Sequence, residues 1–369
     1  MRISALRDLL SQQGASFKER FGVEVPSVIS DLKTEYHAIR DHVGITDFSS
    51  MQKFRITAER GVDFLENLFP GNVAKIRFCR VLHTFLSDEN GNLIADCYIA
   101  NNDEDFIVLC DSVVDDATLK ALMNKYGAQE FGLEDITATH VVFSVDGYKA
   151  WAVVKELCGA DVLGLPYLSV ETYRFEEAPF SLFRAGKTSE FGYLILATKD
   201  MGPKLLAKLI ALAQKNEGGL CGTTIHDTLR LEGRFFNIFA EGLSVKDPLA
   251  LGLQWMIDFD KEVFIGRDPI VTRREKGLTH KIIGVKAESA LEDLKAGAFI
   301  FHEGKQVAQV QAACFSYGLN AWIGLALFPV AIAYPYLSFN LEKPDGLTIA
   351  TIAMPPIMPK SLTVKLDEL

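Results

Sequence analysis

The spacing of apolar residues changes after residue 269, and this change limits the folds that the chain can adopt. Residues 280–369 contain almost no helical periodicity, and their apolar residues form short segments separated by glycine-containing turns. The segments span residues 281–287, 298–302, 306–310 and 347–353. Short strands punctuated by turns are typical of a small barrel or sandwich. The sequence therefore predicts an all-β domain in the last part of the chain.

Two units that mix strands and helices precede this region. In the first unit we expect strands at 53–57, 81–86, 93–100 and 106–110 and helices at 61–68 and 115–126. In the second unit we expect strands at 140–145, 172–175, 180–184 and 193–197 and helices at 147–158 and 202–214. Asn90-Gly91 predicts a tight turn, and Asp115 or Asp116 can cap a helix. This order indicates two related α+β halves with antiparallel sheets.

The first 50 residues are expected to be helical and then loop-like. Residues 35–43 carry apolar side chains at helical spacing, and Gly44 is expected to end that helix. With 369 residues, the chain is long enough for two or three domains.

The charge balance bears on the classes of partner. The chain has 38 Lys and Arg residues against 48 Asp and Glu residues, a net charge of −10, which argues against binding along a nucleic-acid backbone. The most apolar run, residues 322–337, is shorter than a membrane span and contains Pro329 and Pro335, so we expect a buried strand or loop there. The N-terminal segment MRISALRDLL does not resemble a signal peptide. We expect no membrane partner and a cytoplasmic location.

The cysteines do not indicate a metal site. No two of the six lie at the spacing of zinc ligands, so we expect reduced, mostly buried thiols of a cytosolic protein. They are Cys79, Cys97, Cys110, Cys158, Cys221 and Cys314.

Four segments carry more specific combinations of residues. Residues 247–269 read DPLALGLQWMIDFDKEVFIGRDP, and residues 35–51 contain EY followed by GITDFSSM. Residues 85–96 read FLSDENGNLIAD, and residues 226–233 read HDTLRLEG. In order and spacing these segments resemble the motifs of glycine cleavage T-proteins. The chain is identified on them as a divergent member of the family of T-proteins (aminomethyltransferases) and folate-dependent demethylases.

This resemblance implies an α+β fold, the T-protein three-domain ring. Two ferredoxin-like antiparallel α+β domains and a C-terminal β-barrel would surround a central hole. The first domain would comprise residues 1–50 and 136–250, the second residues 51–135, and the barrel residues 275–369. Residues 262–269 lack the cysteine in the signature of T-protein-like proteins that assist iron–sulfur cluster maintenance, which favours the transferase and demethylase branch.

The resemblance also implies an enzyme that transfers an aminomethyl or methyl group from a small-molecule donor to tetrahydrofolate. Asp96 falls at the position of the carboxylate that faces the folate nitrogen in this family. A buried carboxylate can orient an amine, stabilise a developing cation and relay a proton, which would make Asp96 catalytic. In the alternative interpretation Asp96 only closes a hairpin or caps a neighbouring helix. A lipoyl carrier protein is a further partner in such chemistry, but the altered pocket described next makes it less expected.

Several family positions are retained and would contact the folate. Met51, Tyr193 and Arg230 match the family motifs. Arg267 could contact the glutamate tail of a folate, or it could pair with a carboxylate and stabilise a corner between domains.

Other ligand positions differ from the family pattern. Lys187 replaces an aromatic residue, and Leu194 replaces the glutamate that accepts hydrogen bonds from the pterin. A leucine accepts none, so buried pterin donors would lose about 1–3 kcal/mol each. His83 replaces another aromatic residue, His226 replaces an arginine, and Asp111 stands where an asparagine is common.

His83, Asp96, Asp111, Lys187 and His226 thus describe a possible central pocket. One interpretation is a changed ligand or changed chemistry, in which His and Lys carry out acid–base steps near neutral pH or hold an anionic substrate. The other is relaxed constraint, with a non-catalytic ligand-binding or regulatory protein on the same frame. A metal is not expected, because these residues are scattered along the sequence.

Overall fold

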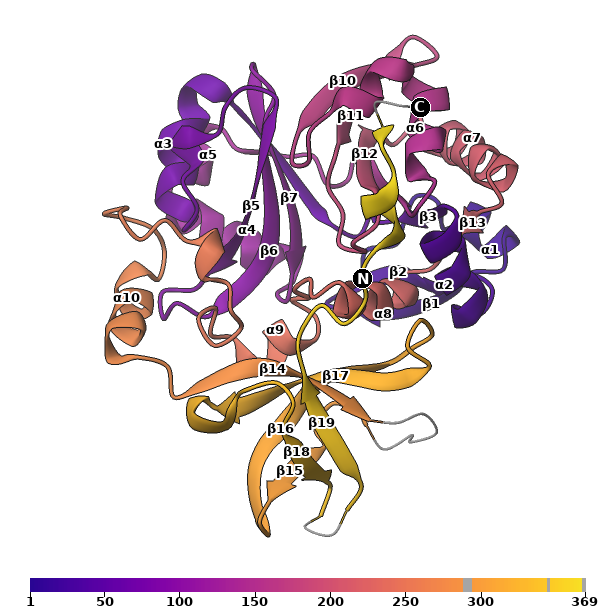
Figure 1. The fold of residues 1–369 in the computed structure, drawn as a ribbon. Coiled ribbons are helices and arrows are strands. Elements are labelled where there is room, and N and C mark those ends of the chain that lie inside the picture. Colours follow the sequence, from indigo (N-terminus) through magenta and orange to yellow (C-terminus); the bar gives the residue numbers. More distant parts are fainter. Residues whose placement is uncertain (288–293, 344–345, 367–369) are drawn as a thin grey trace.

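The computed structural model describes residues 1–287, 294–343 and 346–366, and they form three lobes around a common centre (Figure 1). Two lobes are built on antiparallel sheets covered by helices, and the third is a closed β-barrel. This arrangement confirms the predicted α+β class with a C-terminal barrel.

The lobe that we call the first is formed by residues of the expected second domain. It contains a five-stranded antiparallel sheet in the order β5-β6-β7-β4-β8. Its strands are β4 (Gln52–Thr57), β5 (Arg80–Ser87), β6 (Leu93–Asn101), β7 (Asp105–Ser112) and β8 (Glu134–Asp135). Its helices are α3 (Ala58–Leu68), α4 (Asp116–Lys125) and α5 (Ala128–Phe131), with a 3-10 turn at Val73–Lys75. The expected hairpin is confirmed, because β5 and β6 pair around the turn that contains Gly91. Asp115 caps α4 by accepting a hydrogen bond from Thr118 N.

The second lobe contains a six-stranded sheet in the order β10-β11-β12-β9-β3-β13. Its strands are β3 (Gly44–Asp47), β9 (His140–Asp146), β10 (Val170–Phe175), β11 (Ala178–Phe183), β12 (Gly192–Thr198) and β13 (Gly219–Leu220). Its helices are α2 (Leu32–Asp41), α6 (Ala150–Cys158), α7 (Gly202–Lys215) and α8 (Thr224–Glu232), with a 3-10 turn at Ala160–Gly164. All pairs in it are antiparallel except β13 with β3.

The N-terminal segment differs from the expectation of a helix followed by a loop. After the short helix α1 (Arg7–Gln12), strands β1 (Ser16–Arg20) and β2 (Val23–Val28) form an antiparallel hairpin. Its turn contains Phe21 and Gly22, both at positive φ. The helix expected at 35–43 is α2, and Asp31 caps it with hydrogen bonds from Lys33 N and Thr34 N.

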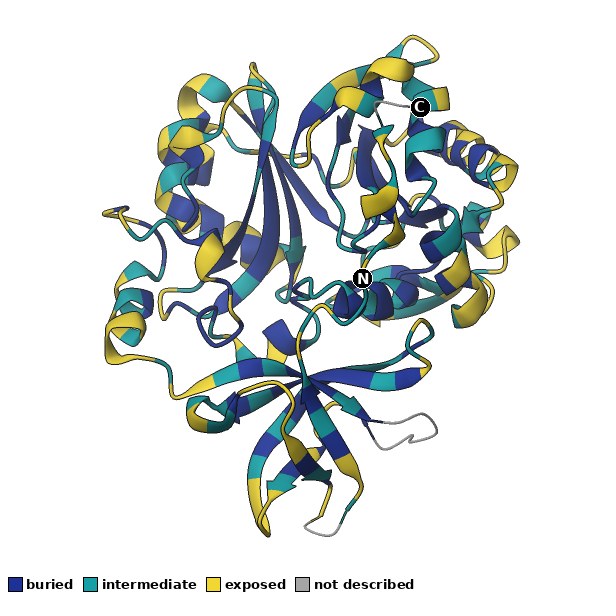
Figure 2. Ribbon diagram, viewed as in Figure 1, coloured by how far each residue is buried: buried dark blue, intermediate teal, exposed yellow. Residues whose placement is uncertain are grey.

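Each of the two large sheets has one face covered by helices and one face turned toward the other sheet (Figure 2). In β9, Val141 and Phe143 pack into the core that includes α6 and α7. Val142, between them, packs in a different core with Leu194 of β12 and Tyr98 of β6. Because successive side chains of a strand point to opposite faces, alternate residues of the facing strands meet between the two sheets.

The third lobe is a closed six-stranded barrel in the order β14-β17-β16-β15-β18-β19. Its strands are β14 (His280–Ala287), β15 (Phe299–His302), β16 (Lys305–Ser316), β17 (Ala321–Pro329), β18 (Ser338–Leu341) and β19 (Thr348–Ile352), with 3-10 turns at Val330–Ile332 and Lys360–Thr363. The apolar run at 322–337 supplies most of β17 and then leaves the sheet at Pro329. Within the three described ranges, no helix is both long and apolar enough to cross a membrane.

The segment 247–269 connects the α+β lobes to the barrel. It contains a 3-10 turn at Gln254–Met256 and runs into α10 (Arg267–Lys276); the short helix α9 (Glu241–Val245) precedes it. Leu249 and Leu251 pack with Phe85 of the hairpin and with Ile323 of the barrel. One apolar cluster therefore joins the first lobe to the barrel through this segment.

Two constraints require a glycine at position 266, immediately before α10. Its φ is +77°, and a Cβ there would lie 2.5 Å from Asp88 O and 2.7 Å from Gly91 Cα. The hairpin turn of β5 and β6 therefore rests directly on the backbone at the start of α10.

We expect Gly266→Ala to lower the free energy of unfolding by about 2–4 kcal/mol, because left-handed backbone strain adds to a clash with another backbone segment. Gly22→Ala is the matched control, since Gly22 has a φ of +79° and nothing within 4 Å of the added Cβ. Urea unfolding of both variants measures the difference. Equal losses would contradict the role of close packing at Gly266.

Candidate functional site

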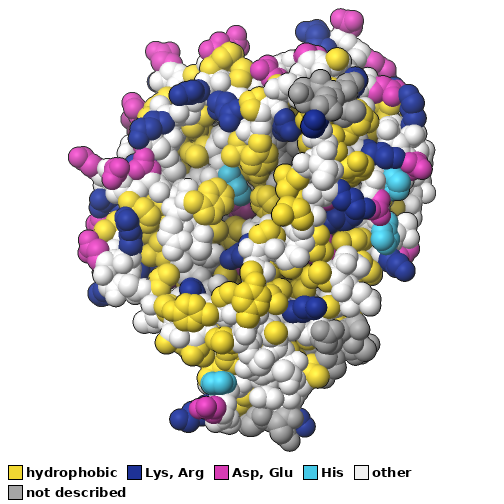
Figure 3. Space-filling model, viewed as in Figure 1, with side chains coloured by type: hydrophobic (Ala, Val, Ile, Leu, Met, Phe, Trp, Pro, Cys, Tyr) yellow, Lys and Arg dark blue, Asp and Glu magenta, His cyan; other side chains and the backbone are white. Residues whose placement is uncertain are grey.

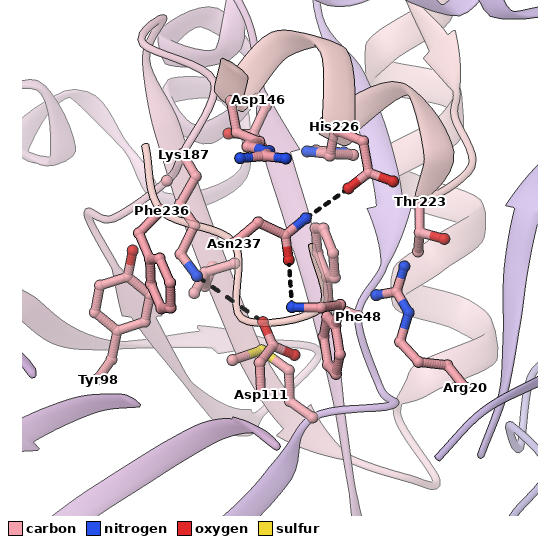
Figure 4. A pocket seen from close by; sticks show the side chains of 16 residues that line it. Arg20, Phe48, Tyr98, Asp111, Asp146, Lys187, Thr223, His226, Phe236 and Asn237 are labelled. Carbon is pink, nitrogen blue, oxygen red and sulfur yellow. Dashed lines mark hydrogen bonds and ion pairs between the residues drawn. The ribbon is translucent and has the colours of Figure 1, made fainter. Parts of the chain in front are cut away.

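The candidate site is a cavity where the facing surfaces of the two sheets meet α8 and the segment that follows it. It encloses about 660 Å³, including space open to solvent. Aromatic side chains form much of its wall, namely Phe48, Tyr98, Phe236 and Phe239 (Figure 4). On the outer surface, apolar side chains gather over the middle of the face where the lobes meet, and charged side chains lie mainly toward its rim (Figure 3).

Asp96 lies on β6 beside this cavity and is almost completely buried, with 2% of its surface exposed. Its Oδ1 lies 2.7 Å from His83 Nε2, and its Oδ2 accepts a hydrogen bond from Lys187 Nζ. Burial alone would raise the pKa of Asp96, but the charge of Lys187 and the contact with His83 hold it well below its usual range. Asp96 is therefore a carboxylate with both oxygens engaged.

Lys187 stands between Asp96 and the cavity. Its Nζ is 4.0 Å from Asp111 Oδ2 and 5.7 Å from the centre of the Tyr98 ring. Burial lowers the pKa of Lys187, but Asp96 and Asp111 outweigh this and raise it, so Lys187 stays an ammonium at neutral pH. Lys187 and Asp111 line the cavity and face each other, whereas Asp96 and His83 are not among its lining residues (Figure 4).

Asp111 is the cross-strand neighbour of Asp96, with β7 pairing to β6 at this position. Burial raises its pKa, the charge of Lys187 opposes this, and the nearby charge of Asp96 adds to it. Two carboxylates thus share one ammonium group. Asp111 is the carboxylate of the pair that faces the cavity and binds protons more readily than an ordinary aspartate.

His83 and His226 occupy different surroundings. The His83 ring stacks on Tyr98 at 4.5 Å and meets Trp255 edge-on at 5.5 Å. His226, on α8, lines the cavity, and its Nε2 lies 2.9 Å from Thr46 Oγ1. Burial lowers the pKa of His226 to about 3, so this ring is neutral near pH 7. His226 therefore faces the cavity as a neutral ring, with one nitrogen that donates and one that accepts a hydrogen bond.

Three further residues expected at the site line the cavity. Met51 and Leu194 form part of its apolar wall and pack together in the core between the sheets. Arg230 also lines the cavity, but its guanidinium is paired with Glu241, with Nη1 2.6 Å from each carboxylate oxygen. Because Glu241 also accepts from Asn237 N, Arg230 supports the chain segment that carries Asn237 into the cavity.

Tyr193 and Arg267 do not reach the cavity. Tyr193 packs in the core beneath α6 and α7, because it immediately precedes Leu194 on β12 and therefore points to the opposite face of the sheet. Arg267 donates through Nε to Lys261 O at 2.6 Å and through Nη1 to Asp268 Oδ1 at 3.1 Å. These contacts fit the corner-stabilising alternative for Arg267, and its contact with a folate tail stays a prediction.

Several cavity residues were missed by the sequence reasoning. Arg20 enters from the unpredicted hairpin, and its guanidinium carbon lies 4.2 Å above the ring of Phe239. Asp146 is the last residue of β9, and its side chain lines the cavity. For Asp146 the sequence contained a signal, a single carboxylate between the apolar residues of an expected strand and Gly147. Phe236 and Asn237 had no comparable signal.

The comparisons with known proteins agree with this arrangement. The family model described as the GCVT N-terminal domain matches residues 6–261. The chain belongs to the glycine cleavage T-protein family. It is 24% identical over 331 residues to an aminomethyltransferase of Thermoanaerobacter sp. (strain X514), covering 89% of each chain. It is 26% identical over 339 residues to an aminomethyltransferase of Picosynechococcus sp., covering 88% of this chain and 89% of that relative.

A solved T-protein structure has the same fold. The glycine cleavage system aminomethyltransferase T from Bartonella henselae aligns with a TM-score of 0.82 and 19% identity, over 97% of this chain and 98% of that one. The described residues therefore form the complete T-protein fold.

The fit of a folate to this T-protein cavity can be judged from its polar atoms. Tyr98 Oη is buried without a hydrogen-bond partner among the described residues. Asp111 and Asp146 add carboxylate oxygens to the wall, and the aromatic side chains suit a flat ring. A ligand with a heteroaromatic ring and N–H donors fits this set, although Leu194 supplies no acceptor.

We expect Lys187→Met to lower the free energy of unfolding at pH 7 by about 3–5 kcal/mol, because it leaves Asp96 and Asp111 without a buried cation. The double variant Lys187→Met/Asp96→Asn should be more stable than the single variant, since it removes the unpaired charge as well. Urea unfolding measures both. A single variant that loses under 1 kcal/mol would show that the ion pair does not hold the two sheets.

The pH dependence of stability should report on Asp146. Burial raises its pKa to about 7, so between the ordinary aspartate pKa and 7 the folded state binds more protons than the unfolded state. Stability contributed by this group therefore falls as pH rises through that window. We expect Asp146→Asn to stabilise the protein relative to the wild type by roughly 2–4 kcal/mol more at pH 8 than at pH 4. A difference between the two proteins that is constant with pH would contradict the raised pKa.

Proposed function

We propose that the protein transfers a one-carbon group, aminomethyl or methyl, from a small-molecule donor to tetrahydrofolate bound in the cavity. The observation that carries this proposal is the cluster of Lys187, Asp96 and Asp111 beside an aromatic-walled cavity on a T-protein frame. Membership of a family with aminomethyltransferase relatives supports the reaction class.

Tetrahydrofolate, when bound, supplies the nitrogen that receives the carbon. The aromatic side chains of Phe48, Tyr98 and Phe236 would hold its ring system, and Tyr98 Oη would gain the hydrogen-bond partner that it lacks among the described residues. These side chains also exclude water, which strengthens the electrostatic interactions of the charges nearby.

The charged residues have separate roles in this proposal. Asp96 stays ionised and positions Lys187 without itself contacting the ligand. Asp111 faces the cavity, and because burial raises its pKa it can hold a proton given up by an amine. Lys187 presents an ammonium that can hold a developing negative charge or an acidic group of the donor. Placement and electrostatics would carry the reaction, with no covalent intermediate on the protein.

A second function is favoured by one specific observation. Both oxygens of Asp96 are already occupied, by His83 and by Lys187. Asp96 is also absent from the cavity lining, so a donor amine in the cavity does not reach it, which favours a ligand-binding or regulatory protein that has kept the T-protein frame without its turnover. Tetrahydrofolate binding without transfer from N-methyl, O-methyl or S-methyl donors would support this alternative.

Calorimetric titration with tetrahydrofolate tests the proposed ligand. We expect the wild type to bind below millimolar concentration and Tyr98→Phe to bind about three- to tenfold more weakly, because one neutral hydrogen bond is lost. Tyr193→Phe is the matched control, because its hydroxyl is also buried and unpartnered among the described residues but lies outside the cavity. Its affinity should equal that of the wild type. No binding to the wild type at millimolar tetrahydrofolate would overturn the proposed function.

A further inference from the structure

The cavity contains a carboxylate for which the T-protein pattern gives no role. A pterin presents a 2-amino group and a neighbouring ring N–H along one edge, and donors enclosed in a protein need acceptors. Leu194 cannot provide one. If a pterin binds here, another side chain must accept from that edge.

Asp146 lies close to the position that an acceptor at residue 194 would reach. On the paired strands β12 and β9, Leu194 is opposite Ser144 and Gly192 is opposite Asp146. Leu194 and Asp146 are therefore diagonal neighbours, whose Cα atoms are typically about 7–8 Å apart, and both side chains line the cavity. A glutamate at 194 and the aspartate at 146 could deliver a carboxylate to the same space.

The surroundings of Asp146 are built around its carboxylate. A Cβ at Gly186 or at Gly192 would lie 2.8 Å from Asp146 Oδ1, so both positions leave room for this group. Ser144 Oγ donates to Oδ2, and Thr188 Oγ1 lies 3.4 Å from Oδ1. The residue is 2% exposed, yet within the described residues its carboxylate has only these two hydroxyls as hydrogen-bond partners.

The other acidic residues of the cavity are already engaged. Asp111 faces the ammonium of Lys187, and Asp227 Oδ1 accepts from Asn237 Nδ2 at 2.6 Å. Asp146 is thus the lining carboxylate, within the described parts of the chain, with neither a cationic nor an amide partner. It also lies well apart from Asp111 along the cavity (Figure 4). One ligand could contact Asp146 with its ring edge and reach Lys187 and Asp111 with its reacting part.

We propose that Asp146 is the specificity-determining residue that accepts hydrogen bonds from the 2-amino group and ring N–H of the pterin, in place of a glutamate at position 194. This inference rests on the proposed function, because it names the contact by which tetrahydrofolate is recognised. In this proposal the acceptor for the pterin lies on β9, at Asp146, and not on the adjacent strand β12, at Leu194.

A double-mutant cycle between protein and ligand tests the contact. Tetrahydrofolate and its 2-desamino analogue are titrated by calorimetry into the wild type, Asp146→Asn, Leu194→Glu and the double variant. We expect the wild type to prefer tetrahydrofolate at least about tenfold, since a charge-assisted hydrogen bond is at stake. Asp146→Asn should lose at least about tenfold in affinity for tetrahydrofolate and lose that preference.

The two remaining variants distinguish relocation of the pterin's hydrogen-bond acceptor from a general loss of affinity. Leu194→Glu alone should bind no more tightly than the wild type, because a second carboxylate beside Asp146 repels it. The double variant should recover affinity and preference to within a few-fold of the wild type. Asp105→Asn, on β7 outside the cavity lining, is the control for removing a partly buried carboxylate.

The outcomes are distinguishable from failure of the proposed function. Unchanged affinity and unchanged preference in Asp146→Asn would overturn this inference while leaving tetrahydrofolate as the ligand. A wild type that binds tetrahydrofolate without distinguishing its 2-desamino analogue would overturn it without any variant. Absence of binding to the wild type would overturn both this inference and the proposed function.

Discussion

The ion pair between Lys187 and Asp96 joins the two α+β lobes at the edge of the cavity. Asp96 belongs to β6 in one sheet, and Lys187 belongs to the segment between β11 and β12 in the other. The surfaces between the sheets are otherwise largely apolar, with Tyr98 and Leu194 among the buried residues. A charge buried in such a surface is costly unless it is paired. Pairing leaves neither charge uncompensated between the sheets, and the cavity lies beside the pair.

The same ion pair decides which charged groups face the cavity. It removes the carboxylate of Asp96 from the cavity and places an ammonium there, with Asp111 as its second neighbour. The cavity therefore presents a cation and a proton-binding carboxylate to a ligand. Family membership alone does not reveal this arrangement, because it depends on the side chains at positions 96, 111 and 187.

Much of the fold could be predicted from the sequence. Strand alternation and the Asn90-Gly91 turn defined the hairpin that carries Asp96, and the loss of helical spacing after residue 269 defined the barrel. The hairpin at residues 16–28 was missed because β1, SFKER, is mostly polar and contains no buried residue, so it carries no clear strand pattern. Arg20 was missed with it.

The candidate site was less predictable, for reasons that particular residues illustrate. Tyr193 and Leu194 are adjacent in a strand, so they point to opposite faces and cannot both line one cavity; strand periodicity alone could have shown this. Arg267 matched a motif, but its contacts are with Lys261 and Asp268 at the corner. The engagement of Asp96 by Lys187 depends on two segments 91 positions apart meeting in space, which local sequence patterns do not encode.

A crystal structure of the protein with tetrahydrofolate would show which side chains contact the pterin and whether the Lys187–Asp96 pair persists. We expect the pterin between the aromatic walls of the cavity, its 2-amino edge within hydrogen-bond distance of Asp146, and Lys187 still paired with Asp96. A pterin bound with that edge away from Asp146, or Lys187 displaced so that Asp96 contacts the folate, would contradict this account.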